Sequence, residues 1–242
     1  MFLPTTREEM DRLGWDQLDI ILMTGDSYID SPFIGIAVIG KELRDAGYRV
    51  GIIAQPDTNS DKDISRLGEP RLFWGVSGGC VDSMIANYTS LKKKRKSDDY
   101  TPGGINDRRP DRAVIVYTNL IKRFFKSNRP IVLGGIEASL RRIAHYDFWS
   151  NSIRSSILFD AKADYLLYGM ADKAVIQLAG ALKAGADVRD IRGVCYIAGE
   201  GDLLQKRADY LELPPFEMVK TDNQAFIDMF QTFYRNNDPL TA

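Results

Sequence analysis

The sequence has few of the residues that build metal centres and acid–base catalytic sites. Its 242 residues include one histidine, His145, and two cysteines, Cys80 and Cys195. A single histidine excludes a zinc site built on several imidazoles and leaves a Ser-His triad only one candidate base. The two cysteines lie far apart and fit no metal-ligand spacing. We expect two buried, reduced thiols, with a disulfide as the alternative.

Long apolar runs and a strong net charge are also missing. No window approaches the roughly 20 apolar residues of a membrane span, and no secretion signal is visible. The formal net charge of -1 favours neither acidic nor basic partners. We therefore expect a soluble, cytoplasmic, globular chain without a membrane partner. One local exception is the basic run at residues 92–96, which reads Lys-Lys-Lys-Arg-Lys.

What the sequence does contain is a repeated alternation of strand and helix patterns. Short apolar runs that end in turn residues predict buried parallel strands at 18–24, 48–54, 72–77, 130–133 and 163–168. Helical patterns lie between them at 32–47, 81–91 and 111–126, and a further one follows at 172–185. The first β-α-β unit implies a right-handed crossover. The pattern predicts an α/β fold with a doubly wound, mostly parallel sheet.

Other segments set the expected domain limits. Thr5 or Thr6 is expected to cap a first helix. Residues 92–110 are polar and turn-rich, which predicts an exposed, mobile excursion. Residues 194–198 and 203–204 predict a C-terminal hairpin, and residues 222–235 an amphipathic helix. We expect a domain at 1–213, a helical linker at 214–242, and a protein that continues beyond Ala242.

The ends of the predicted strands form the candidate functional site. In an open parallel sheet the ligand crevice lies at the carboxyl ends of the strands. The candidates for a ligand cleft there are Thr24, Gly25, Asp26, Ser27, Ser77, Gly78, Gly79, Gly134, Gly135, Glu137, Tyr168 and Gly169. Tight β-to-α turns explain each glycine pair equally well. The pattern is neither a P-loop nor a dinucleotide fingerprint.

Four of the polar residues near these ends have competing interpretations. Asp26, like Asp30, could bind a ligand hydroxyl or a cation, or could cap a turn. Glu137 suits the dipole of its own first helical turn without any function. Cys80 follows two glycines but has no histidine near it in the sequence, which favours a structural thiol over a nucleophile.

A basic and aromatic patch follows the fourth predicted strand. It consists of Arg141, Arg142, His145, Tyr146, Phe148, Trp149 and Arg154. Such a patch could dock another domain or contact RNA, although an ordinary half-buried surface explains it too. The basic run at 92–96 is either a solvated loop or a modest RNA contact.

Several segments resemble the YgiQ-like radical-SAM family. They are Phe2–Thr6, Trp15-Asp16, Gly25–Pro32, Gly47–Pro56 and Gly134–Trp149. Residues 130–139, 163–169 and 191–196 are similar to the cobalamin-binding-like domain that precedes many radical-SAM barrels. The resemblance covers essentially the whole chain. It implies a cobalamin-binding/flavodoxin-like fold and an N-terminal accessory domain whose partner is the protein's own C-terminal radical-SAM barrel.

The resemblance also implies where the cofactors lie. In that family the barrel holds a [4Fe-4S] cluster through C-x-x-x-C-x-x-C and cleaves S-adenosylmethionine. This motif is absent here and Cys80 and Cys195 cannot replace it, so we expect no catalytic residue, no metal ligand and no activity in this segment. Cobalamin domains with an axial histidine use D-x-H-x-x-G, whereas Asp26–Asp30 contains no histidine. The alternatives are a stand-alone module that binds a nucleotide, or cobalamin without a protein ligand, and an RNA-contacting domain.

Overall fold

A six-stranded sheet organises most of the chain. A computed structural model describes residues 2–126, 129–199 and 210–237. The strands of this sheet are β1 (Ile20–Thr24), β2 (Val50–Ala54), β3 (Phe73–Ser77), β4 (Ile131–Gly134), β7 (Tyr165–Leu167) and β8 (Val194–Tyr196). They lie in the order β2-β1-β3-β4-β7-β8, and only β8 runs antiparallel to its neighbour. The predicted mostly parallel sheet is confirmed, with the strand order 2-1-3-4-5 of flavodoxin-like folds and one added edge strand.

The chain divides into two compact units. The first holds Met1–Arg142 and Ile157–Ile197, and the second holds Ile143–Ser156 and Ala198–Ala242. The sheet lies wholly in the first unit. The expected boundary at residue 213 stays a prediction.

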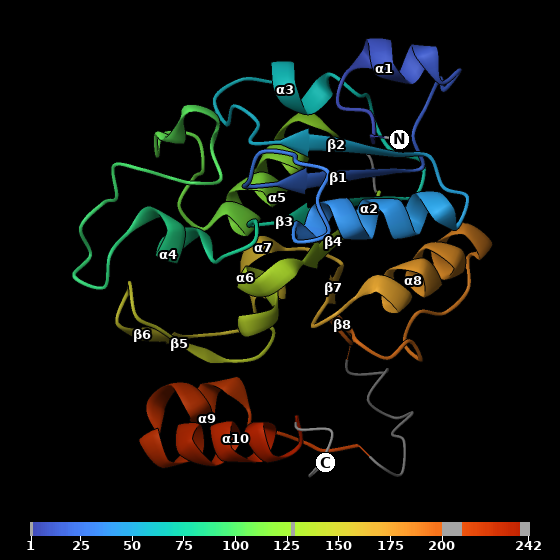
Figure 1. Cartoon of the computed structure of the whole chain (residues 1–242). Helices are drawn as coiled ribbons and strands as arrows, with labels where there is room; N and C mark the ends of the chain where they lie inside the picture. Colours follow the sequence, from blue (N-terminus) through green and yellow to red (C-terminus); the bar gives the residue numbers. More distant parts are fainter. Residues whose placement is uncertain (1, 127–128, 200–209, 238–242) are drawn as a thin grey trace. The chain divides into compact units, whose positions relative to one another are not determined.

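Helices cover both faces of the sheet, because successive side chains of a strand point to opposite faces. Ile20 and Leu22 pack on the face that carries α2 (Gly35–Asp45) and α8 (Asp172–Ala184), which lie together in front of the sheet in Figure 1. Ile21 and Met23 pack on the opposite face. The helices that contribute to this second core are α1 (Arg7–Arg12), α3 (Lys62–Ser65), α5 (Ala113–Phe124), α6 (Gly135–Leu140) and α7 (Ile157–Ala161). The doubly wound architecture is therefore confirmed.

The first helix begins as its sequence predicts. The Glu9 amide donates to Thr6 Oγ1 at 3.3 Å, and the Thr6 amide donates to the Glu9 carboxylate at 3.1 Å. This reciprocal capping box satisfies two amide groups that a helix start leaves without partners. It holds α1 where Met10 is fully buried.

The excursion at 92–110 differs from its prediction. The basic run at 92–96 is exposed, as expected. Asp98, Thr101, Asn106 and Arg109 are buried, however, and a short 3-10 turn (Pro102–Gly104) lies among them. The prediction of an exposed segment is wrong for these four residues, because their polar groups find partners inside the first unit. The helix preceding this segment, α4 (Ser83–Asn87), is also shorter than predicted.

The second unit contains a small hairpin and two helices. These are β5 (His145–Asp147), β6 (Ser152–Arg154), α9 (Phe216–Thr221) and α10 (Asn223–Arg235). The strands pair antiparallel, and Asp222 caps α10 by accepting from the Gln224 amide at 2.8 Å. The predicted amphipathic helix is confirmed as α10, with Ala225 and Met229 buried. Of the predicted hairpin at 194–204, β8 forms, whereas residues 203–204 lie outside the described residues.

A helix that crosses a lipid bilayer is long and apolar. Within the described residues, none combines the length and the apolar composition that crossing a membrane requires.

Candidate functional site

A cleft of about 440 Å³ opens at the carboxyl ends of β1, β3, β4 and β7, on the face of the sheet that carries α2 and α8. We call it the strand-end cleft. Seven of the candidates from the sequence line it: Thr24, Asp26, Ser77, Gly79, Gly134, Gly135 and Gly169. The other five, which are Gly25, Ser27, Gly78, Glu137 and Tyr168, do not. Their role in binding a ligand stays a prediction.

Small residues on neighbouring strands form the floor of the strand-end cleft. Thr24, Ser77 and Gly134 lie side by side in register on β1, β3 and β4. A Cβ atom built on Gly134 would come no closer than 4.0 Å to another heavy atom, the Leu167 carbonyl oxygen. Two residues earlier on β3, Gly75 faces the same side, but the Leu22 side chain fills its space, because a Cβ there would lie 2.5 Å from Leu22 Cδ2. The recess in the sheet is therefore at Gly134, a core-facing position that carries no side chain.

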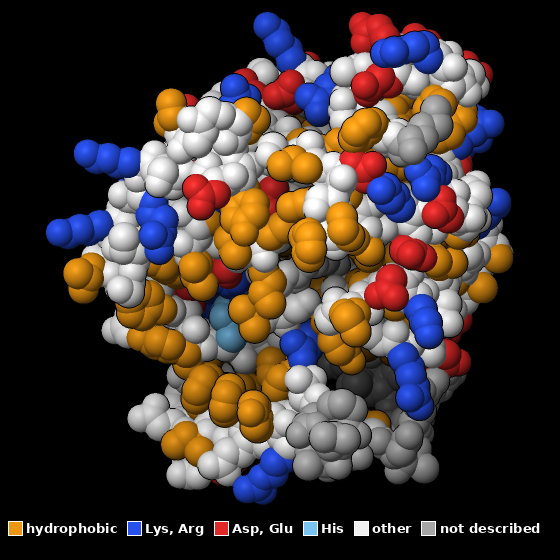
Figure 2. Space-filling view, in the orientation of Figure 1, with side chains coloured by type: hydrophobic (Ala, Val, Ile, Leu, Met, Phe, Trp, Pro, Cys, Tyr) orange, Lys and Arg blue, Asp and Glu red, His pale blue; other side chains and the backbone are white. Residues whose placement is uncertain are grey.

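The walls of the strand-end cleft are apolar. Ile34, Val38 and Ile39 line it from α2 and its N-cap, and Val175 lines it from α8. At its rim Phe33 is 89% exposed and Met170 94% exposed. Figure 2 shows hydrophobic side chains gathered over the N-terminal end of α2. Exposed apolar side chains beside a concave apolar surface are typical of a binding site.

The polar groups in the strand-end cleft are few. Thr24 Oγ1 accepts from the Asp26 amide at 3.2 Å, and Ser77 Oγ accepts from the Gly79 amide at 3.1 Å. A hydroxyl that accepts one hydrogen bond still has a proton to donate. The charged residues of the lining are Asp26 and Asp172, and among the described residues no Lys, Arg or His contributes to it.

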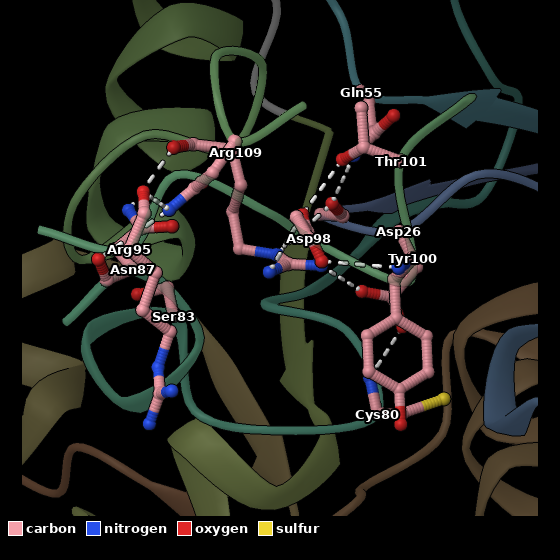
Figure 3. Close-up of polar contacts among 12 residues, drawn as sticks. Asp26, Gln55, Cys80, Ser83, Asn87, Arg95, Asp98, Tyr100, Thr101 and Arg109 are labelled. Atoms are coloured by element: carbon pink, nitrogen blue, oxygen red, sulfur yellow. Dashed lines mark hydrogen bonds and ion pairs between the residues drawn. The ribbon is translucent and has the colours of Figure 1, made fainter. Parts of the chain in front are cut away.

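Asp26 is committed to the protein itself rather than open to a ligand. Its Oδ1 lies 2.5 Å from Arg109 Nη2, and its Oδ2 accepts from the Cys80 amide at 2.6 Å. Arg109 Nη1 in turn lies 3.1 Å from Asp98 Oδ2 (Figure 3). All three charged side chains are buried. Of the two roles left open for Asp26, this geometry supports a structural one.

The same network attaches the segment at 98–109 to the loop after β1. Gln55 Nε2 donates to the Gly25 carbonyl at 2.9 Å and to Thr101 Oγ1 at 2.6 Å. The Ser27 amide donates to the Tyr100 carbonyl at 2.8 Å. Gly25 itself must be a glycine, because a Cβ there would lie 2.2 Å from the Gly78 carbonyl oxygen. Arg109, Asp98 and Gln55 are not among the residues predicted for the site, because their local sequence pattern gives no sign of their shared partners.

Glu137 lies away from the strand-end cleft and joins two other helices. Its Oε2 accepts from the Ser83 amide at 2.9 Å and its Oε1 from the Val114 amide at 3.2 Å, at the starts of α4 and α5. Burial, followed by the nearby Asp82 carboxylate, raises the pKa of Glu137. Glu137 therefore accepts hydrogen bonds from amides that have no partner within their own helices, in addition to lying favourably at the positive end of its own helix dipole.

Neither cysteine has the environment of a nucleophile. Both thiols are free. Burial and the Asp26 carboxylate raise the pKa of Cys80 to about 11, and burial raises the pKa of Cys195 to about 11. Because the thiolate is the reactive form, these values support structural thiols. Among the described residues no cluster of His, Cys, Asp and Glu is arranged to hold a metal ion.

The predicted basic and aromatic patch is divided between the two units. Arg141 pairs with Asp82, and the Arg142 guanidinium lies 4.5 Å from the centre of the Tyr168 ring, all within the first unit. His145, Tyr146, Phe148, Trp149 and Arg154 belong to the second unit. There Phe148 and Trp149 pack edge to face, with ring centres 5.3 Å apart.

The first unit thus defines a doubly wound, flavodoxin-like domain with an apolar cleft at its strand ends. A family model described as radical SAM N-terminal matches residues 2–242, and the chain belongs to this family. The resemblance seen in the sequence is confirmed.

Close relatives are longer proteins. A UPF0313 protein of Fusobacterium nucleatum is 55% identical over 242 residues, covering 100% of this chain and 42% of the relative. A UPF0313 protein of Thermotoga maritima is 56% identical over 239 residues, covering 97% of this chain and 41% of the relative. One from Methanocella arvoryzae is 50% identical over 238 residues, covering 97% and 39%. The chain thus spans about two-fifths of the length of these relatives.

Solved structures give a more distant match. Two structures of the radical S-adenosylmethionine methyltransferase TsrM from Kitasatospora setae match with a TM-score of 0.49 each. One, with tryptophan substrate and a S-adenosylmethionine analogue bound, is 18% identical and matches over 74% of this chain and 28% of TsrM. The other, with cobalamin and a [4Fe-4S] cluster bound, is 17% identical over 74% and 27%.

Proposed function

We propose that this chain is the N-terminal accessory domain of a radical SAM enzyme and that its strand-end cleft binds a small ligand. The observation that carries the proposal is the cleft itself, which has an apolar lining and a recess at Gly134. Open parallel sheets bind ligands at this position, and a volume of about 440 Å³ is within the range of small-molecule sites. Family membership supplies the radical SAM context.

The iron–sulfur cluster and S-adenosylmethionine belong, in this proposal, to the part of the longer protein that lies outside the chain. A cubane cluster needs several closely placed thiolates. Cys80 and Cys195 are the only cysteines here, so the residues present do not fit the cluster. Residues 1–213 would then act as the domain that covers the catalytic part, and residues 214–242 as the connection to it.

Anaerobic reconstitution with iron and sulfide tests the assignment of the cluster. The 242-residue chain and the longer natural protein are treated in parallel, and 5′-deoxyadenosine formation from S-adenosylmethionine is measured under reducing conditions. We expect a cluster spectrum and 5′-deoxyadenosine from the longer protein alone. A cluster on the 242-residue chain, or none on the longer protein, would contradict the proposal.

Cobalamin is a second candidate for the ligand, favoured by the apolar recess at the strand ends. No histidine lines the cleft among the described residues, and His145 lies in the other unit. Cobalamin would therefore be held without an axial ligand from the first unit, and only part of so large a molecule would enter the cleft. Gel filtration with hydroxocobalamin tests this: retention that Gly134→Leu abolishes supports the candidate, and no retention by the unaltered chain rejects it.

An RNA contact is supported by a different surface, the exposed basic run at 92–96. Phosphate contacts release counterions, so their affinity falls steeply with salt. Fluorescence anisotropy with a single-stranded RNA at several salt concentrations tests it. Binding that is insensitive to salt, or unchanged when the lysines are replaced by glutamine, would count against this role.

A further inference from the structure

We infer that the strand-end cleft takes an uncharged, mainly apolar molecule whose one polar edge forms hydrogen bonds with Thr24 and Ser77. This inference rests on the proposed ligand-binding role of the cleft and names the chemistry of its ligand. It does not depend on the radical reaction of the longer protein.

The apolar walls of the strand-end cleft favour a ligand that is mainly apolar. Aliphatic side chains of α2, α8 and the sheet line both sides of the cleft. Burying apolar surface against them is favourable by roughly 25 cal/mol per Å². A polar body would lose its hydrogen bonds to water here without replacement.

The two hydroxyl groups in the floor of the cleft favour a ligand with one polar edge. Thr24 and Ser77 are direct neighbours in the register of β1 and β3. Each hydroxyl already accepts one backbone amide, which leaves its proton and a second lone pair for a ligand. A ligand that meets both hydroxyls must therefore present a hydrogen-bonding edge, such as a carbonyl oxygen, a ring nitrogen or an amine.

The absence of charge follows from the electrostatics of the lining. An anion would meet no Lys, Arg or His among the described lining residues, and it would lie near the Asp172 carboxylate. The positive end of α8 already has Asp172 in its first turn. The Asp26 charge is compensated by Arg109, so the cleft does not attract a cation through it either. This chemistry argues against the phosphates of a nucleotide.

Two fluorescent probes with one skeleton test the inference. N-phenyl-1-naphthylamine is uncharged, and 8-anilino-1-naphthalenesulfonate carries the same rings with an added sulfonate. Both are titrated into the 242-residue chain. We expect the uncharged probe to bind at least roughly tenfold more tightly, a factor set by about one carboxylate–anion repulsion in a partly buried site.

Substitutions that fill the strand-end cleft test whether the probe binds there. Gly134→Leu places a side chain in the open space of the floor and should abolish most of the binding. Gly180→Leu is the matched control, because Gly180 lies on α8 outside the lining and a Cβ there meets only Tyr48 Oη, at 3.8 Å. Val38→Trp fills the cleft from α2 and serves as a second variant if Gly134→Leu does not fold.

The outcomes separate the inference from the proposed function. Tighter binding of the sulfonate, lost in Gly134→Leu, would overturn the uncharged ligand and leave a ligand-binding cleft. Binding of the uncharged probe that both filling variants leave intact would place it elsewhere and overturn the inference. If neither probe binds, both the inference and the ligand-binding role fail, whereas the 5′-deoxyadenosine assay still decides the radical SAM assignment on its own.

Discussion

Arg109 Nη2 lies 2.5 Å from Asp26 Oδ1 in the interior of the first unit, although 83 residues separate the two in the sequence. Asp98 approaches the same guanidinium from its other nitrogen, at 3.1 Å. One arginine therefore compensates two buried carboxylates, one at the edge of the strand-end cleft and one in the segment at 98–109.

Replacing this arginine should destabilise the fold strongly. Arg109→Met leaves Asp26 and Asp98 buried without a counter-charge, and breaking a buried pair in this way typically costs about 3–5 kcal/mol. Urea unfolding followed by circular dichroism measures the loss. Arg189→Met is the matched control, because Arg189 pairs with Asp187 at the surface and should leave the unfolding midpoint unchanged. Equal shifts in the two variants would refute the structural role of Arg109.

Glu137 should make stability depend on pH in an unusual direction. Its pKa is raised above the ordinary value of 4.5, so the folded state binds its proton more tightly than the unfolded state does. Its contribution to stability is therefore largest below pH 4.5 and declines as the pH rises through the raised pKa. Relative to Glu137→Gln, which does not titrate, the unaltered chain should lose stability across that window.

Glu9 provides the control of opposite sign. Hydrogen bonds from Thr5, chiefly its amide, lower the pKa of Glu9 below 4.5. Its contribution is present above pH 4.5 and is lost as the pH falls through the lowered pKa. Denaturant titrations at several pH values give the difference in stability between the unaltered chain and each variant, Glu137→Gln or Glu9→Gln. This difference should fall with rising pH for Glu137 and rise with pH for Glu9. Changes of the same sign would contradict the assignment for Glu137.

The two adjacent glycines after β4 should respond differently to substitution. Gly135 has φ +78°, and a Cβ there would lie 2.6 Å from Ser77 Oγ. Gly135→Ala should therefore cost about 1–2 kcal/mol from the left-handed backbone alone, with the close contact in addition. Gly134→Ala adds a methyl group to extended backbone facing open space and should change the midpoint little. Thermal unfolding of both variants distinguishes them, and equal losses would be incompatible with this geometry.

Both cysteines should react slowly with iodoacetamide near neutral pH. Each thiol has a pKa of about 11, above that of a free thiol, because burial penalises the thiolate. Mass spectrometry of the alkylated chain follows the two sites separately, with glutathione as the reference thiol. The rates should rise as the pH rises toward the raised pKa values. Reaction of Cys80 faster than glutathione would reopen its role as a nucleophile.

The doubly wound, mostly parallel sheet could be predicted from the sequence because the signals of its strands and helices are local. An apolar run such as residues 18–24 ends in turn residues, and a helix of period 3.6 follows. Five such strands alternating with helices leave few arrangements other than a doubly wound sheet. The small residues Ser77 and Gly134 could likewise be placed at the strand ends.

The buried network could not be predicted, since its signals are not local. Asp98 and Arg109 lie in a stretch whose composition is typical of an exposed loop. Their burial depends on a partner, Asp26, that only the folded chain brings near. The partners of Glu137 could not be predicted for the same reason, because the amides it binds belong to α4 and α5. The β5–β6 hairpin has strands of three residues each, too short for a periodic pattern to identify.

The missing side chain at Gly134 has a consequence for how the strand-end cleft can adapt. At this position there is no rotamer to change, and the backbone is paired in register with Ser77 of β3. The depth of the cleft at Gly134 is therefore fixed before any ligand arrives. Adjustment to the size of a ligand is then expected at the rim, where the Phe33 and Met170 side chains are almost fully exposed. The cleft should then accept ligands of different lengths, which extend past the rim, but only ligands thin enough for the fixed space within it.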